Sequence, residues 1–343
     1  MKSPPLSPYG VFTGQLFQYS ASPSLIAFES SPPLPIISSI PLPSSSSSSQ
    51  SSQTNNKCIL LGGLSDGPIS TPYTKLLETK CHTLGWSLVQ PVLSSSYLGF
   101  GHGSLERDTK ELVTLMDYLV CHHSAERFAL VGHSTGCQNS IHFLKYGRRD
   151  VVDRMKVVAL QAPVSDRESL TLSPGSNHSA EHLIHAKSLI SQKKGNEMMP
   201  RSAFWAPITA SRYVSLFDIG GDDDYFSSDF TNEELAERLG HVGDVGKESG
   251  LRLLAAFSKK DEYVPESVER DVLLERLVSA MNNGFDGGGG GDGGDGGEST
   301  AVVVARGLML ENGNHNLSKG EGDKEEFVEA VGKLMELATS DVQ

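Results

Sequence analysis

The sequence predicts an α/β fold, in which a mostly parallel central sheet carries helices on both faces. From Cys58 onwards, short apolar runs alternate with amphipathic helical stretches, a pattern typical of parallel sheets. Residues 166–250 interrupt this alternation with polar, mostly helical sequence, and the alternation resumes at Leu251. We therefore expect a helical cap inserted between the two halves of one core.

The first half of the core is expected to follow an N-terminal strand pair. That pair, Val11 to Tyr19 and Ser24 to Glu29, forms a unit of residues 1–31, and a Pro/Ser-rich loop over 32–56 follows it. Residues 57–165 then form the first half of the core. Its predicted strands cover 58–61, 86–92, 128–131 and 157–161, and its predicted helices cover 72–84, 105–120 and 137–146.

Residues 251–343 are expected to complete the core. The predicted elements are strands at 251–257 and 301–305 and helices at 265–281 and 325–338. The last helix shows an apolar stripe that includes Phe327, Val331 and Leu334. A Gly/Asp-rich tract separates its first helix from its last strand, and we expect residues 284–297 to form a disordered loop.

Composition excludes several classes of partner. The net charge of −13 argues against nucleic-acid binding and against adhesion to anionic membranes. No run of eighteen apolar residues occurs, so we expect no membrane span. The four cysteines lack C-x-x-C spacing and lie in apolar or helical stretches, which predicts buried free thiols in a reducing compartment: Cys58, Cys81, Cys121 and Cys137.

The N-terminal region does not resemble a secretory signal. Residues 1–56 contain one basic residue, Lys2, and no compact apolar segment follows Met1. The segment is rich in serine and nearly free of acids, as plastid transit peptides are, although it lacks arginine. We expect a cytoplasmic protein and keep plastid targeting as the alternative.

The pentapeptide Gly132-His133-Ser134-Thr135-Gly136 indicates a serine nucleophile. It follows the apolar run 128–131 and precedes a helix, and a G-x-S-x-G turn between a strand and a helix exposes its serine above the sheet. Gly132 and Gly136 suit positions where a side chain would collide with the crossing backbone. The helix that begins beside Ser134 would favour a developing oxyanion.

A serine hydroxyl needs a base, and the base needs an acid that orients it. In this architecture the chain order is serine, acid, histidine. His315 is the one histidine beyond position 241, and it follows the last predicted strand. Asp261 follows the preceding strand and is the predicted acid, with Glu262 and Asp166 as alternatives.

An oxyanion hole requires two backbone N–H groups. One comes from the residue after the nucleophile, which is Thr135. The loop after the strand at 58–61 supplies the other, and Leu64 is the expected donor because the preceding Gly62 and Gly63 allow close approach of the backbone.

These features resemble the α/β-hydrolase superfamily over roughly residues 58–338. The chain also resembles a small eukaryotic family of mostly uncharacterised hydrolases that includes fungal esterases of fusarinine-type siderophores. This narrower resemblance rests on the stretches at 62–67, 97–108, 161–168 and 224–229. It implies the α/β-hydrolase fold and hydrolysis of a carboxylic ester of a small molecule. It does not imply a siderophore substrate.

The predicted reaction is acyl transfer through Ser134, His315 and Asp261, and it needs no metal and no organic cofactor. Two other functions remain open. One is a non-catalytic small-molecule receptor or binding protein of the same fold. The other is a zinc peptidase, because residues 178–182 spell H-x-x-E-H, although Pro174 and Gly175 place His178 at or before a helix start. The sequence gives no indication of the oligomeric state.

Three further motifs are interpreted as having no catalytic, cofactor-binding or metal-binding role. Residues 99–103 lack the third glycine of a dinucleotide-binding fingerprint and are expected to form a loop near the pocket. Residues 222–224, three aspartates, lack the spaced ligands of a calcium loop and are expected to form a solvated or helix-flanking acidic turn. His122 and His123 end a helix and are expected to complement its dipole.

Overall fold

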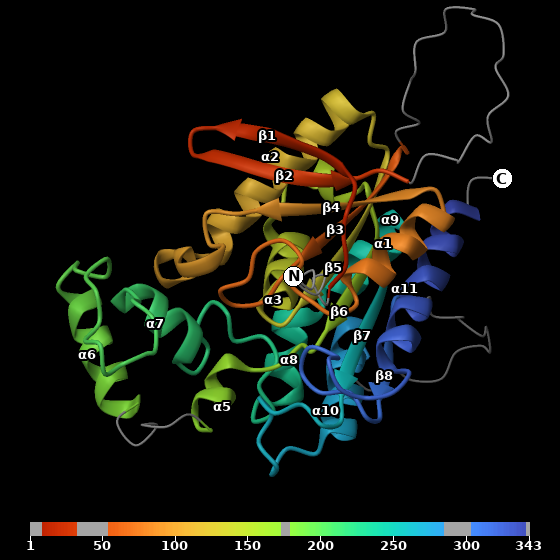
Figure 1. The fold of residues 1–343 in the computed structure, drawn as a ribbon. Coiled ribbons are helices and arrows are strands. Elements are labelled where there is room, and N and C mark those ends of the chain that lie inside the picture. The colour runs from red at the N-terminus through yellow and green to blue at the C-terminus, as the bar shows by residue number, and fades with distance from the viewer. Residues whose placement is uncertain (1–8, 33–53, 173–178, 285–302, 341–343) are drawn as a thin grey trace, which may run out of the picture.

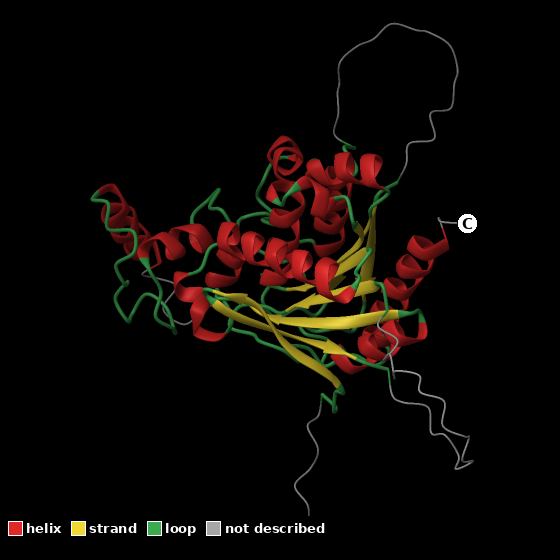
Figure 2. Cartoon of the chain, turned by 90° about the horizontal axis from the view of Figure 1, so that it is seen from above, coloured by secondary structure: helices red, strands yellow, loops and turns green. Residues whose placement is uncertain are grey.

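The computed structural model describes residues 9–32, 54–172, 179–284 and 303–340. Its central feature is an eight-stranded sheet that carries helices on both faces (Figures 1 and 2). The strand order is β1-β2-β4-β3-β5-β6-β7-β8. The sheet is antiparallel at β1, β2 and β4 and parallel across the rest. The predicted fold class is confirmed.

The antiparallel edge is the predicted N-terminal strand pair. β1 (Gly14–Ala21) and β2 (Ser24–Ser30) form a hairpin, and β2 pairs with β4 (Trp86–Val92). The exposed positions of β1 alternate with more buried ones in part of the strand, as expected for an edge strand with one face toward the core.

The parallel strands bring their carboxyl ends to one edge. They are β3 (Asn56–Leu61), β5 (Arg127–His133), β6 (Met155–Gln161), β7 (Arg252–Ser258) and β8 (Ala305–Leu310). The last strand differs from the prediction of residues 301–305, because it begins where the predicted strand ends. The prediction followed the apolar run that ends at Ala305, because such a run is typical of a buried strand. β8 is instead the edge strand of the sheet, where the exposed residues Arg306 and Gly307 can be accommodated.

Helices cover the two faces of the sheet with separate apolar clusters. α1 (Thr74–Thr83) and α11 (Asp323–Ser340) pack on one face. The opposite face carries α2 (Leu105–His123), α3 (Thr135–Tyr146), α8 (Asn232–Leu239), α9 (His241–Ser249) and α10 (Arg270–Met281). The short α4 (Arg149–Val152) lies between α3 and β6.

The insertion between β6 and β7 divides into two parts. α5 (Asp166–Leu170), α6 (Ser179–Ser191) and α7 (Ala210–Phe217) project beside the core, and the apolar side chains of α6 and α7 form a cluster of their own (Figure 1). In contrast, α8 and α9 contribute Leu235, Leu239, Val242 and Val245 to the main core. Residues 99–103, expected to form a loop, belong mostly to the 3-10 helix η1 (Tyr97–His102), which lies against α7.

Other predictions have mixed outcomes. No helix in the described part of the chain is long and apolar enough to cross a membrane. Cys58, Cys81 and Cys137 are buried free thiols, but the prediction for Cys121 is wrong, because its position on α2 is exposed. The predicted loops at 32–56 and 284–297 lie mostly outside the described residues.

Candidate active site

Ser134 stands at the sharp turn between β5 and α3. Its backbone adopts φ 52° and ψ −122°, a strained conformation for a residue with a side chain. The turn leaves no room at its flanking glycines. A Cβ on Gly136 would lie 2.5 Å from the Leu61 carbonyl oxygen, and one on Gly132 would collide with the carbonyl oxygen of Gly136. The geometry is that of a nucleophile elbow.

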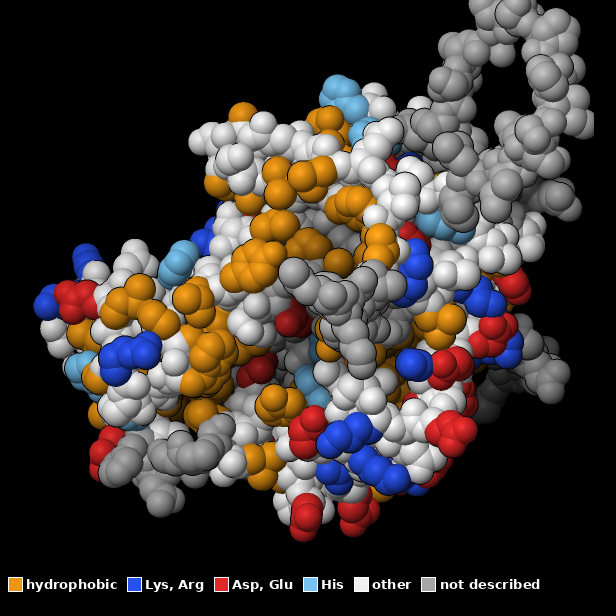
Figure 3. Space-filling view, in the orientation of Figure 1, with side chains coloured by type: hydrophobic (Ala, Val, Ile, Leu, Met, Phe, Trp, Pro, Cys, Tyr) orange, Lys and Arg blue, Asp and Glu red, His pale blue; other side chains and the backbone are white. Residues whose placement is uncertain are grey.

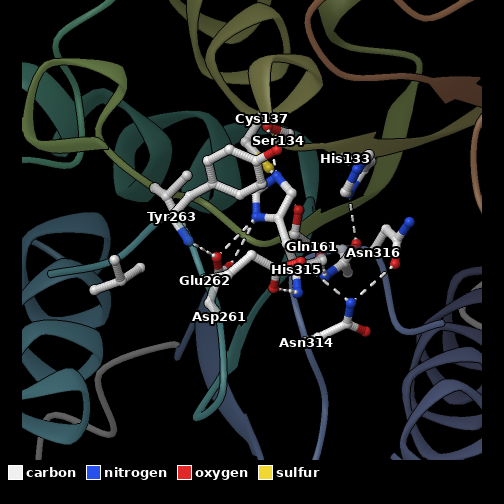
Figure 4. Close-up of polar contacts among 12 residues, drawn as sticks. His133, Ser134, Cys137, Gln161, Asp261, Glu262, Tyr263, Asn314, His315 and Asn316 are labelled. Atoms are coloured by element: carbon white, nitrogen blue, oxygen red, sulfur yellow. Dashed lines mark hydrogen bonds and ion pairs between the residues drawn. The ribbon is translucent and has the colours of Figure 1, made fainter. Parts of the chain in front are cut away.

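His315 links Ser134 to Asp261 (Figure 4). The Nε2 atom of His315 lies 2.9 Å from Ser134 Oγ, and its Nδ1 lies 2.8 Å and 3.0 Å from the two carboxylate oxygens of Asp261. Asp261 is buried, and its Oδ1 also accepts the Tyr263 backbone N–H at 2.9 Å. The structure therefore brings together the three residues proposed from chain order.

Glu262 contacts His315 in a different way. Its Oε2 accepts the backbone N–H of His315 at 2.9 Å, and its Oε1 accepts from Asn314 Nδ2 at 3.3 Å. From the other side, Gln161 Nε2 donates to the His315 carbonyl oxygen at 2.9 Å. Glu262 and Gln161 thus fix the backbone of the histidine, whereas Asp261 contacts its ring.

A second histidine lies beside His315. The His133 and His315 ring centroids are 5.0 Å apart, and the Nδ1–H of His133 donates to Gln161 Oε1 at 2.7 Å. Burial, and then the charge of His315, lower the pKa of His133 to about 3. His133 is therefore neutral at physiological pH and adds no positive charge next to Ser134, His315 and Asp261.

The loop after β3 approaches Ser134 closely. A Cβ on Gly63 would lie 2.9 Å from Ser134 Cβ. The Gly63 N–H donates to Asp66 Oδ2 at 2.8 Å, so Asp66 holds the loop in place. Within the described residues no partner is found for the next N–H, that of Leu64, or for that of Thr135. These two N–H groups are the ones expected to bind an oxyanion.

A cavity of about 460 Å³ opens above Ser134 and His315. Core loops line one side with Asp66, Glu262 and Tyr263, and the insertion lines the other with apolar side chains: Leu170, Phe204, Trp205 and Phe217. Figure 3 shows a hollow that contains acidic and histidine side chains, flanked by hydrophobic ones. The site is thus large enough for a small organic molecule.

Asp166, the alternative acid, lines the same cavity but does not contact the histidine ring. Its Oδ2 accepts from Gln138 Nε2 at 2.9 Å. Burial, followed by the nearby charge of Asp223, raises the pKa of Asp166 to about 7. This carboxyl is consequently a titrating group in the cavity wall.

One of the motifs interpreted as having no binding or catalytic role, residues 222–224, lies in the insertion and is partly buried. The expectation of a solvated turn at 222–224 is wrong for Asp223 and Asp224, which are buried and paired with arginines. Asp223 Oδ2 lies 2.5 Å from Arg212 Nη1, and Asp224 Oδ2 lies 3.1 Å from Arg167 Nε. Sequence reasoning missed these ion pairs, because an acidic run shows its partners only once the chain is folded.

The zinc-peptidase motif is only partly described. His178 lies outside the described residues, and His182 lies on α6 with its ring 6.4 Å from that of Tyr213. In the described part of the chain, no group of three or more His, Cys, Asp or Glu residues is placed to hold a metal ion.

The chain matches a known protein family. Residues 40–291 match the model of a protein family of unknown function, DUF1749. The chain belongs to this family. A UPF0613 protein of Schizosaccharomyces pombe is 33% identical over 239 residues, covering 66% of this chain and 75% of the relative. The fusarinine C esterase sidJ of Aspergillus fumigatus is 30% identical over 271 residues, covering 66% and 76%.

Solved structures place this DUF1749 chain in the α/β-hydrolase fold. The siderophore hydrolase EstB from Aspergillus fumigatus superposes with a TM-score of 0.69 at 23% identity, over 98% of this chain and 100% of that one. A protein of unknown function with the same fold superposes with a TM-score of 0.58 at 19% identity, over 97% of both chains. The chain is thus related to fungal siderophore esterases, as the sequence motifs suggested.

Proposed function

We propose that this protein is a serine esterase that hydrolyses a carboxylic ester of a small molecule through an acyl-enzyme. One observation carries the proposal: the His315 ring lies within hydrogen-bond distance of both Ser134 Oγ and Asp261. Two curated relatives support it, the fusarinine C esterase and an esterase from Emericella nidulans that is 28% identical over 272 residues.

In the first step, Ser134 Oγ attacks the ester carbonyl carbon while His315 Nε2 accepts its proton. Asp261 accepts the Nδ1–H and stabilises the imidazolium that forms. His315 then returns the proton to the departing alkoxide, which leaves as the alcohol. The product of this half-reaction is an ester between Ser134 and the acyl group.

The tetrahedral intermediate places a negative charge on the former carbonyl oxygen. The Leu64 and Thr135 N–H groups would donate to that oxygen, and the strained backbone of Ser134 holds the nucleophile beside them. Water then attacks the acyl-enzyme with His315 as its base, which releases the acid and restores Ser134. The apolar insertion wall (residues 170, 204, 205 and 217) would bind an apolar part of the substrate.

The test combines a mutation with an active-site probe. Ser134→Ala should lower kcat for a short-chain p-nitrophenyl ester by at least about 10⁴-fold, because nucleophile, base and acid act as a unit. A fluorophosphonate should label the wild-type protein at Ser134 and should not label the variant. Ser140→Ala, six residues further along the chain on α3, is the matched control and should keep both ester hydrolysis and labelling.

The same experiment separates an esterase from a receptor of the same fold. A folded wild-type protein that binds ligands but neither reacts with the fluorophosphonate nor hydrolyses any ester would be a binding protein, and our proposal would be wrong. Retention of ester hydrolysis by Ser134→Ala would equally exclude Ser134 as the nucleophile.

A further inference from the structure

A second, smaller cavity lies behind the loop that follows β3. It has a volume of about 40 Å³ and shares the wall of residues 63–66 with the main cavity. Both expected oxyanion donors border it, because Leu64 and Thr135 are among its lining residues. We call it the side chamber.

Three oxygen atoms of the side chamber lack hydrogen-bond partners. They are Thr135 Oγ1, Asn139 Oδ1 and Asp108 Oδ1, each buried and without a partner in the described part of the chain. The three side chains are at least nine-tenths buried, with exposures of 7%, 7% and 4%. Buried polar atoms are rarely left unpaired, because the lost hydration is costly. These oxygens therefore indicate a bound group that donates hydrogen bonds.

The elements around the chamber hold these side chains firmly. Thr135 and Asn139 are one turn apart on α3 and thus share a helix face. Asp108 on α2 keeps its other oxygen occupied, since Oδ2 accepts from Ser95 Oγ at 2.8 Å. The acceptors come from two helices of the core, so they do not depend on a loop adjusting its shape.

The hydrogen-bonding groups of the chamber select among possible ligands. Arg212 lines the chamber from α7, but its charge is paired with Asp223 and its Nε donates to the Phe100 carbonyl oxygen at 3.2 Å. Asn139 Oδ1 and Asp108 Oδ1 accept hydrogen bonds, whereas the Thr135 hydroxyl can donate as well as accept. The volume suits one or two small groups, since a water molecule needs about 10–15 Å³ measured in the same way. A hydroxyl fits this size and both donates and accepts, whereas an ammonium group only donates.

We propose that the side chamber is a substrate subsite for a hydroxyl group on the carbon next to the ester carbonyl. The preferred substrates are then esters of 2-hydroxy acids. This inference rests on the proposed esterase function and adds a substrate class to it. The hydroxyl donates its one hydrogen bond to the unpaired oxygen of Asn139 and accepts from the Thr135 hydroxyl, while the neighbouring carbonyl oxygen lies at the Leu64 and Thr135 N–H groups.

Methyl lactate and methyl 2-methylpropanoate form a matched pair of probes, because they differ only by a hydroxyl in place of a methyl group. Each kcat/KM is divided by the rate constant of hydroxide-catalysed hydrolysis of the same ester. The wild-type enzyme should then prefer the lactate ester by about tenfold or more. Asn139→Leu should reduce this ratio towards one by weakening the lactate reaction. The control Ser140→Ala should keep the ratio, because that hydroxyl donates to the Gly136 carbonyl oxygen.

The outcomes separate this inference from the proposed function. If the wild type hydrolyses both esters with a corrected ratio near one, the chamber holds ordered water only and the subsite is wrong. If it hydrolyses neither, the esterase proposal is in question, and calorimetric binding of the two esters to Ser134→Ala decides the subsite. Methyl lactate should bind that variant at least about fivefold more tightly, and equal or weaker binding would overturn the subsite.

Discussion

At the scale of single residues, the candidate site depends on how His315 is held. Besides Ser134, three side chains form hydrogen bonds with it at different atoms. Asp261 contacts the ring, Glu262 accepts from the backbone N–H, and Gln161 donates to the backbone oxygen. The two neighbouring acids therefore have separable roles, which the sequence could not distinguish because both follow β7 in the same loop.

Substitution of the two acids should separate these roles. Asp261→Asn should lower kcat about 10⁴-fold, because the amide no longer selects the right imidazole tautomer or stabilises its charged form. Glu262→Gln retains an oxygen that can accept the His315 N–H, and it should lower kcat by less than about tenfold. Steady-state kinetics on one ester measures both. Equal losses in the two variants would argue against Asp261 as the acid.

Asp166 gives a prediction about stability and pH. Its pKa is about 7 in the folded protein, mainly because of burial, against about 3.9 in an unfolded chain. Between these values the folded state binds more protons, so this residue makes the free energy of unfolding fall as pH rises from 4 to 7. Asp166→Asn removes that dependence and keeps an acceptor for Gln138. The variant's stability advantage should grow by on the order of 1–3 kcal/mol over this range.

Urea unfolding at several pH values measures this advantage. Asp108 also titrates in the range, with its pKa raised by burial to about 6, but it is present in both proteins and cancels in the difference. A difference in unfolding free energy between wild type and Asp166→Asn that does not change from pH 4 to 8 would contradict the assignment.

The sequence predicted some functional residues and missed others for definable reasons. Ser134 and His315 could be proposed because motif and chain order constrain them. Gln161 was missed, although it stands at the end of β6 opposite His133 in the strand register. Adjacent carboxyl ends of parallel strands meet at one edge, and that rule would have placed Gln161 beside the elbow.

At the scale of elements, a buried group of four charged and polar side chains joins strands that the sequence analysis treated separately: Glu29, Lys57, Ser87 and His123. Lys57 on β3 is fully buried, and its Nζ lies 2.5 Å from Glu29 Oε1 on β2. Ser87 on the intervening β4 donates to the same oxygen at 2.6 Å, and His123 at the end of α2 contacts Oε2. His123, expected to complement the helix dipole, does lie in the last turn of α2, and it is also buried against the strand pair.

This group should make the N-terminal strand pair sensitive to single substitutions. Glu29→Gln leaves the Lys57 charge buried without its partner and should destabilise the protein by about 3–5 kcal/mol. The double variant with Lys57→Met removes both charges and should recover part of that loss. Chemical denaturation of the wild type, both single variants and the double variant gives the coupling.

The pH dependence supplies a second readout. Burial alone would raise the pKa of Glu29, but Lys57, Ser87 and His123 together lower it below its ordinary value. The stability that this carboxylate contributes is therefore present above its ordinary pKa and is lost as pH falls through the lowered one. Additive effects of the two substitutions would show that the residues do not act as a pair.

Element boundaries were predicted well where the chain is buried on both sides and less well at the sheet edge. β4 and β6 lie within the sheet, and their apolar runs identify them. β8 is at the edge, where Arg306 and Gly307 are exposed, so apolar content is a poor guide to its position.

At the scale of the whole molecule, the cap helices α6 and α7 form a separate apolar unit attached to the core by polar contacts. Their cluster shares no residue with the two clusters on the sheet faces. Arg212 is central to the attachment. It donates to the Phe100 carbonyl oxygen in η1 and pairs with Asp223, while the Thr209 N–H donates to the Gly101 carbonyl oxygen at 2.8 Å. Sequence patterns located this insertion but could not show how it is anchored.

A unit with its own small core and a polar attachment should open at a lower free energy than the sheet. In native-state hydrogen exchange, amides of α6 and α7 should therefore exchange faster than those of β5 and α11. Arg212→Met leaves Asp223 buried without its partner and should speed exchange in α6 and α7 by about tenfold or more, without changing β5. Arg148→Met is the control, since its ion pairs with Asp117 and Asp150 are exposed and contribute little. Were Arg212→Met to accelerate exchange equally in the cap helices and in β5, the cap and the core would unfold as one unit. The wall that the cap contributes to the main cavity would then be as rigid as the sheet that holds Ser134.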